Sequence, residues 1–219
     1  MKYFQIIFLL FFSCSLLAET RIDYYVNLGG IKIADANFTI KSDKNNWSLL
    51  TEVEAAGIVD VFVKFISTTE SKGIINDNKL VPELYKFSYL TERGSSRNGS
   101  ITYKDNIPIR LAADPNYADD EKPSLKFLEK YGSASNDPYS ALLVHGSYTD
   151  PCQFIAQGFD GLRSFKTIFV RPAKEEKIKI GGQEVLTSKC VGYFDPIIGY
   201  KESDFLDEIS KPGSVRYWF

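Results

Sequence analysis

The stretch CQFIAQGFDGLR, residues 152–163, decides how the second half of this chain folds. Its Asp160-Gly161 pair is one of the strongest signals for a hairpin turn between two β-strands. Phe159 before the turn and Phe165 after it can anchor the flanking strands. The stretch therefore predicts a β-hairpin.

The cysteine of this stretch is better explained as a structural staple than as a reactive group. Once a signal peptide is removed, only Cys152 and Cys190 remain, an even pair for an oxidising compartment in which disulfides persist. The bridge would close a long loop and contribute about 4 kcal/mol in the chain-entropy description. The alternative is a pair of buried free thiols. Arg163 is left either exposed or paired with a carboxylate.

The first 18 residues have the features of a secretory signal peptide. Lys2 precedes an apolar run at residues 4–12, which is shorter than the roughly 20 residues of a membrane span. We expect cleavage after Ala18 and export to the periplasm, with lipid attachment at Cys14 as the alternative. No later stretch is apolar enough for a transmembrane anchor, so the mature chain is expected to have none.

The charge balance argues against a nucleic-acid partner. The formal net charge is −2, and loss of Lys2 leaves 25 cationic against 28 acidic residues, or −3. Phosphate binding needs a basic face, and no such face is visible. The length fits one domain, and 44% hydrophobic residues suffice for an ordinary core.

Residues 19–219 read as a single domain of β-strands, because apolar and polar residues alternate with a period of two. Gly29-Gly30 and Gly181-Gly182 mark hairpins, and a slip of the alternation near Ile33 predicts a β-bulge. Residues 57–66 fit a helix as well as a strand, and residues 94–99 read as a flexible connection. Pro82 belongs near a strand start or a sheet edge.

The composition changes at residues 112–146, where Pro, Asp, Asn and Ser become frequent. This segment predicts a loop with two short inserted helices. Ser124 can cap the first helix and Gly132 can end it. Asp137 can cap the second, with Pro138 at its first position and Gly146 as its end. The chain stops within an expected strand, which indicates either the last strand of the sheet or a truncation before a further hairpin.

No catalytic, cofactor-binding or metal site is visible. His145 is the single histidine, and a helix-terminal position explains it better than a role as a general base. A lone histidine with two spaced cysteines is not a closed set of metal ligands. Phosphate loops and dinucleotide fingerprints are absent. The acids occur mainly in polar segments, where a solvated surface is the ordinary explanation; they are Asp119-Asp120-Glu121, Glu175-Glu176, Asp204 and Asp207-Glu208.

Aromatic residues provide a candidate ligand-lining surface. On a strongly curved sheet, a face rich in rings is either packed core or the wall of a site for an apolar guest. Packing is the ordinary explanation, and the guest is kept as the functional alternative. The candidate lining residues are Trp47, Tyr85, Phe87, Tyr89, Tyr103, Phe165 and Phe169.

Several motifs, in this order, resemble a bacterial envelope family known as domain of unknown function 3108. The resemblance rests on YYV (24–26) with GGI (29–31), LVP (80–82), Cys152, FDGLR (159–163), Cys190 and PIIGY (196–200). It implies an exported β-rich protein without an established enzymatic activity, with a half-barrel like that of periplasmic lipoprotein carriers. Leu162 and Ser164 interrupt a run that is more basic in many relatives, and relatives continue past the Tyr217-Trp218 step.

We therefore expect a mainly β protein, a curved antiparallel sheet or partly open barrel with short inserted helices. The expected function is non-catalytic: binding an apolar or amphipathic, lipid-like ligand in the concave face, or acting as an envelope scaffold with a protein partner. The alternative is a carboxylate-dependent hydrolase of cell-wall or lipid material. That alternative needs two acids facing each other in a pocket.

Overall fold

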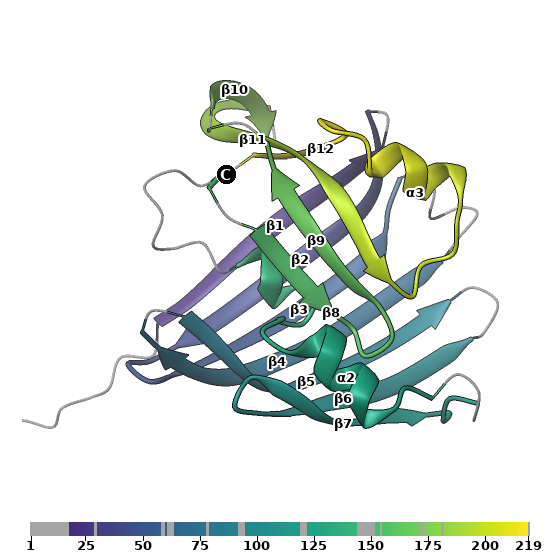
Figure 1. Ribbon diagram of the computed structural model, residues 1–219. Helices are drawn as coiled ribbons and strands as arrows, with labels where there is room; N and C mark the ends of the chain where they lie inside the picture. The colour runs from purple at the N-terminus through teal and green to yellow at the C-terminus, as the bar shows by residue number, and fades with distance from the viewer. Residues whose placement is uncertain are drawn as a thin grey trace, which may run out of the picture.

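The computed structural model describes residues 18–218 except 29, 58–59, 61–63, 78, 92–94, 119–121, 144–151, 154, 171, 173 and 181. Two antiparallel sheets make up the molecule (Figure 1). The first has seven strands in sequence order, and the second has the order β10-β11-β9-β8 with β12 paired to β11. The sheets curve without closing into a barrel, which confirms the expected fold class.

The seven-stranded sheet is a meander in which each strand pairs with the next. Its strands are β1 (Ala18–Leu28), β2 (Ile31–Ser42), β3 (Asn46–Ala55), β4 (Phe65–Asn76), β5 (Lys79–Thr91), β6 (Ser96–Lys104) and β7 (Ile107–Asp114). The hairpin expected between β1 and β2 is confirmed, because Leu28 pairs with Ile31.

The second sheet contains the hairpin that the opening stretch predicts. Its strands are β8 (Ile155–Phe159), β9 (Ser164–Phe169), β10 (Lys174–Ile180), β11 (Gln183–Ile198) and β12 (Val215–Trp218). Phe159 pairs with Ser164, so Asp160–Arg163 form a four-residue loop between β8 and β9. β10 and β11 form the expected hairpin, because Ile180 pairs with Gln183.

The β-bulge and the strand proline lie where the sequence predicts them. Val26 pairs with Ala34 and Asn27 with Lys32, which leaves Ile33 as the extra residue of a bulge. Pro82 lies near the start of β5 and pairs with Gly73, whereas the pairing between β5 and β6 begins only at Leu84. The missing Pro82 N–H therefore costs no ladder bond with β6.

The connection expected at residues 94–99 is wrong from Ser96 onward. β6 begins at Ser96 and runs beside β5, with Arg97 opposite Tyr89 and Gly99 opposite Phe87. Ser, Asn and Gly have low strand propensity, but pairing with an adjacent strand outweighs that local preference. The consequence is that Arg97 belongs to the sheet.

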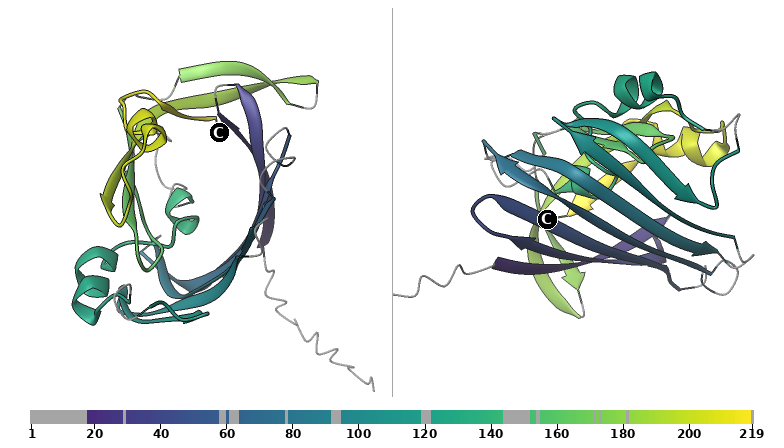
Figure 2. Two further views of the ribbon diagram at one scale, coloured as in Figure 1. Left: turned by 90° about the vertical axis from the view of Figure 1, so that its right-hand side faces the viewer. Right: turned by 90° about the horizontal axis from the view of Figure 1, so that it is seen from below.

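The first inserted helix is confirmed and the second is not. α2 (Leu125–Gly132) begins at Ser124, whose hydroxyl accepts a hydrogen bond from the Phe127 amide at 3.2 Å. The expected second helix is only a 3-10 turn, η1 (Ser140–Leu142). In Figure 2 this short segment lies within the curve of the seven-stranded sheet, whereas α2 lies outside it against β7 and β8. Among the described residues of the expected helix, 137–143, contacts of η1 with β8 take the place of further helical turns.

A third helical segment, α3 (Asp204–Ile209), was missed. Ser203 caps it by accepting from the Leu206 amide at 3.2 Å, and acids occupy its first turn. That pattern is an N-terminus signal that sequence reading could have used. No helix in the described parts of the chain is long and apolar enough to cross a membrane.

Several expectations concern residues that the structure does not describe. They include the signal peptide up to residue 17 with Cys14, the acids at 119–121, His145 with Gly146, and most of the ambiguous segment at 58–63.

Candidate functional site

The FDGLR turn is held by its own aspartate. Asp160 Oδ1 accepts from the backbone amides of Leu162 at 2.9 Å and Arg163 at 2.6 Å. Gly161 adopts a φ of +100°, which favours glycine. Burial raises the pKa of Asp160, and the two amide hydrogen bonds oppose this rise. The interpretation of this aspartate and glycine as turn residues is confirmed.

Arg163 is paired and also largely exposed. Its Nη1 lies 3.8 Å from Asp160 Oδ2, and 55% of its side chain is exposed. Its guanidinium lies 5.9 Å from the centre of the Tyr200 ring. Burial, followed by the negative charge of Asp160, raises the pKa of Tyr200 to about 12, against the opposing charge of Arg163.

The two most specific motifs of the chain, FDGLR and PIIGY, meet at Gly199. A Cβ atom on Gly199 would lie 2.4 Å from the Leu162 carbonyl oxygen and 3.1 Å from Arg163 Cα. The φ of Gly199 is +85°. Both the backbone conformation and the close approach of backbone therefore require glycine here.

Gly199→Ala is expected to lower the free energy of unfolding by about 2 kcal/mol, because the methyl group adds a contact with backbone to the cost of a positive φ. Gly182→Ala is the matched control, since Gly182 also has a φ of +85° but has nothing within 4 Å of the added Cβ. Urea unfolding of both variants measures the difference. Equal losses would show that the contact between the motifs contributes nothing.

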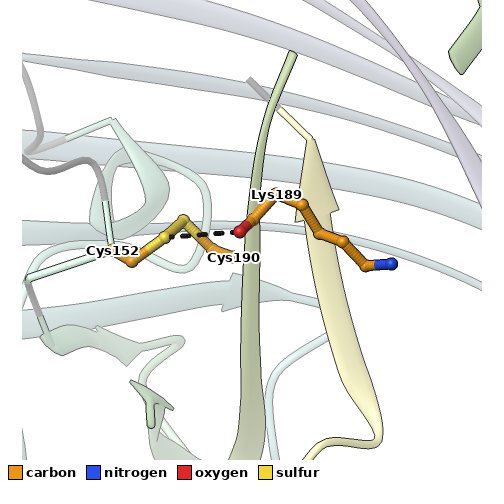
Figure 3. Close-up of a disulfide and its surroundings, with 3 residues drawn as sticks. All are labelled: Cys152, Lys189 and Cys190. Atoms are coloured by element: carbon orange, nitrogen blue, oxygen red, sulfur yellow. Dashed lines mark hydrogen bonds between the residues drawn. A yellow bond between two sulfur atoms is a disulfide. The ribbon is translucent and has the colours of Figure 1, made fainter. Parts of the chain in front are cut away.

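The disulfide predicted from the cysteine count is present in the structure. Cys152 and Cys190 are bridged, with their Cα atoms 5.3 Å apart (Figure 3). Both residues are buried, at 4% and 0% exposure. The bridge attaches the segment that enters β8 to the middle of β11. It therefore links the segment before the edge strand β8 to the inner strand β11, which lies on the far side of β9.

The concave face of the seven-stranded sheet is built from rows of side chains fixed by strand register. Residues on this face alternate with outward ones along each strand. The three central rows are Ala36–Val53–Ser67–Tyr89–Arg97, Phe38–Thr51–Thr69–Phe87–Gly99 and Ile40–Leu49–Ser71–Tyr85–Ile101.

The candidate lining residues divide into buried and half-buried groups. Trp47, Tyr85 and Tyr103 are 3–5% exposed and belong to the apolar clusters of the core. Phe87 and Tyr89 follow Tyr85 on the same face of β5 and are half-buried. In the second sheet, Phe165 stacks on Phe194 at 5.1 Å and Phe169 contacts Tyr217 edge-on at 5.5 Å. The structure therefore uses part of the set as core.

A line of small hydroxyl residues crosses the middle of the concave face. We call Thr51, Ser67, Thr69 and Ser71 the hydroxyl stripe; all are at most 7% exposed. The hydroxyl oxygens of Thr51 and Thr69 are buried without a direct hydrogen-bond partner, as is that of Tyr103, whereas the Ser71 hydroxyl lies beside Asp137 and that of Ser67 beside Tyr139. Each such group costs on the order of 1–3 kcal/mol relative to a satisfied one. A core built only for stability would place methyl groups here.

Residues 137–143, which we call the plug, cover this stripe. Tyr139 and Leu143 pack on the apolar cluster that contains Phe38, with the Tyr139 and Phe38 rings 6.2 Å apart. Hydrogen bonding to Ser67 opposes the rise that burial causes in the pKa of Tyr139. The end of the plug therefore presents an aromatic and an aliphatic side chain to the concave face.

Asp137, at the start of the plug, is fully buried. It accepts from the Tyr139 and Ser140 amides at 3.1 Å each, and also from the Ser140 hydroxyl. Burial raises the pKa of Asp137, and these hydrogen bonds and the nearby Ser71 hydroxyl oppose the rise. Sequence reading identified Asp137 only as a helix cap. Its position inside the curved sheet had no signal in the local sequence.

Most of the acids considered for a hydrolytic site are elsewhere. Residues 119–121 lie outside the described residues, Glu176 is paired with Lys189 at 2.6 Å, and the acids of α3 are exposed. Asp137 and Asp160 are each committed to backbone amides. Among the residues described, no group of His, Cys, Asp and Glu lies together as metal ligands.

A surface groove of about 320 Å³ lies at the end of the sheet that carries Trp47. Its lining includes Lys41, Lys72, Asp43 and Glu83, so charges of both signs are present. Lys41 also pairs with Glu19 at 3.3 Å. The groove offers no single charge preference to a ligand.

These features define a class of protein: a disulfide-stapled, mainly antiparallel β domain whose curved sheet has a mixed aromatic and hydroxyl concave face. The chain belongs to the family described as protein of unknown function DUF3108, whose family model matches residues 21–219. No curated protein and no solved structure matches the chain.

Proposed function

We propose that this protein is an exported, non-catalytic envelope protein that binds an amphipathic ligand on the concave face of its seven-stranded sheet. The observation that carries the proposal is the hydroxyl stripe, in which the Thr51 and Thr69 hydroxyls lie buried between aromatic side chains without hydrogen-bond partners. Apolar walls with a few polar groups are the usual composition of a small-molecule site. Export is supported by the disulfide, which persists in oxidising compartments.

The plug indicates the chemistry that the concave face accepts. Its Tyr139 and Leu143 occupy the apolar side of the stripe, next to Phe38, and its Asp137 lies beside Ser71. A ligand with an apolar chain and a polar group would replace these contacts when it displaces the plug. An envelope scaffold would also use a filled interior, but it has no need of buried, unpartnered hydroxyls.

Native mass spectrometry of the mature protein after gentle purification tests the proposal. We expect an adduct of lipid size that is lost when the protein is unfolded. Extraction with organic solvent followed by analysis of the extract identifies its class. A protein that never carries such an adduct, and that acquires none from a mixture of envelope lipids, contradicts ligand binding and favours the scaffold.

The hydroxyl stripe provides a variant that separates binding from stability. Thr51→Val with Thr69→Val replaces two unpartnered hydroxyls by methyl groups of the same shape. We expect the free energy of unfolding to stay the same or to rise by about 1 kcal/mol, while the adduct is lost. Thr68→Val, at an exposed position on the opposite face of β4, is the control and should retain the adduct. Retention of the adduct by the double variant would remove the stripe from the site.

A further inference from the structure

We propose that the ligand carries an anionic head group, a carboxylate or a phosphate, which Arg97 binds at one end of the concave face. This inference rests on the proposed function and adds the chemistry of the ligand. The end in question, which we call the arginine end, is formed by Tyr89, Arg97 and Tyr117.

Strand register places Arg97 on the concave face. In β6, Arg97, Gly99 and Ile101 alternate onto one side, and Ile101 is fully buried in the core beside Tyr85. Arg97 therefore lies on the same face of the sheet as Tyr85, Phe87 and Tyr89, and it pairs directly with Tyr89. A cation at the end of a strip of aromatic rings has the arrangement that an amphipathic anion requires.

Arg97 is held in place but has binding capacity left. Its guanidinium lies over the Tyr117 ring, 4.4 Å from the ring centre, and its Nε is buried without a hydrogen-bond partner. Within the described part of the chain, no carboxylate lies within ion-pair distance of Arg97. Guanidinium groups bind carboxylates and phosphates through pairs of parallel hydrogen bonds.

Tyr117 is the hydrogen-bonding neighbour of Arg97 at the arginine end. Burial raises the pKa of Tyr117, and the charge of Arg97 and a hydrogen bond from Arg97 oppose this rise. The negative charge of Asp160 also acts on Tyr117, so the FDGLR turn lies toward this end. Asp160 is already bound by two amides and paired with Arg163. Unlike Arg163, Arg97 has no carboxylate partner among the described residues, and its charge is available to a ligand.

The path from Arg97 to the plug fits a head group with an attached chain. Phe87 lies over Gly99, whose added Cβ would approach the Phe87 ring to 2.3 Å. Tyr85 follows, with its ring centre 5.8 Å from that of Phe87. A chain that starts at Arg97 therefore runs along Tyr89, Phe87 and the hydroxyl stripe to the position that the plug occupies.

Binding of three twelve-carbon probes tests the inference: laurate, dodecyl phosphate and the neutral dodecanol. Isothermal titration below the micelle threshold gives the dissociation constants. We expect Arg97→Gln to weaken binding of the anionic probe or probes about tenfold, the loss of one charge-assisted interaction, and to change dodecanol less than twofold. Arg110→Gln, an exposed arginine on the other face of β7, is the matched control and should change nothing. Arg97→Lys keeps the charge and should retain binding within about threefold.

The outcomes separate this inference from the proposed function. The tighter of the two anionic probes names the head group as carboxylate or phosphate. If no probe binds the native protein, the proposed function itself fails. If dodecanol binds as tightly as both anions and Arg97→Gln changes none of them, only the anionic head group is overturned. Inorganic phosphate that binds as tightly as dodecyl phosphate would show a free-anion site and would also overturn it.

Discussion

Replacing Cys152 and Cys190 together by alanine will lower the free energy of unfolding by about 4 kcal/mol. The bridge spans 38 positions of the chain, and the loss of loop-closure entropy in the unfolded state gives this magnitude. Both sulfurs are buried in the folded protein, so packing changes add to the loss. Urea unfolding of the oxidised protein and of the variant measures the difference.

Single replacements provide the control for this effect. Cys152→Ala and Cys190→Ala each break the same bridge, so each should lose nearly as much as the double variant, because the two residues act as one unit. Thiol titration of unfolded, unreduced mature protein should find neither cysteine reactive. Two titratable thiols there, or an unchanged urea midpoint in the double variant, would show that the bridge does not form.

Asp137→Ala is expected to lower the free energy of unfolding by about 3 kcal/mol. The carboxylate is fully buried and is the acceptor for two backbone amides and the Ser140 hydroxyl. Alanine leaves these donors buried without partners, which is among the most destabilising classes of substitution. Thermal and urea unfolding both measure the loss.

Asp43 is the matched control, because it has the same hydrogen-bond pattern in an exposed turn. Its Oδ1 accepts from the amides of Asn45 at 2.8 Å and Asn46 at 2.7 Å. Water can replace the carboxylate there, so Asp43→Ala should lose much less stability than Asp137→Ala. Equal losses would mean that burial of Asp137 is not the cause.

The same carboxylate makes a defined contribution to the pH dependence of stability. Burial raises the pKa of Asp137 in the folded protein. Below the ordinary aspartate pKa of about 3.9 both states are protonated, and this contribution to stability is complete. As pH rises through the raised pKa, the unfolded chain ionises first and the contribution is lost. Asp137→Asn should therefore remove a decline in stability between mildly acidic and neutral pH, as unfolding at a series of pH values would show.

Strand positions and turns were predictable because their causes are local. Period-two alternation indicated a domain of β-strands. Gly-Gly and Asp-Gly pairs identified the β1–β2, β8–β9 and β10–β11 hairpins. The capping hydroxyl of Ser124 identified α2 in the same way. Each of these signals lies within a few residues of the element that it specifies.

Predictions failed where a distant segment supplies the partner. Arg97 was assigned to a flexible connection because Ser, Asn and Gly surround it, yet pairing with Tyr89 places it in β6. Asp137 was assigned to a helix cap, which is half correct, because its hydrogen bonds are those of a cap but only a 3-10 turn follows. The concave face to which both belong exists only after seven strands have paired.

A β-strand meander with a disulfide follows from the amino-acid sequence alone, because alternation and turn residues act over short range and the cysteines need only be counted. The entry of residues 137–143 into the curve of the sheet, and the position of Arg97 across from Tyr89, become visible only in the folded protein. Those positions depend on the register of β3 to β6 and on the curvature of the sheet. Register is the sum of many pairings, and no single local pattern encodes it.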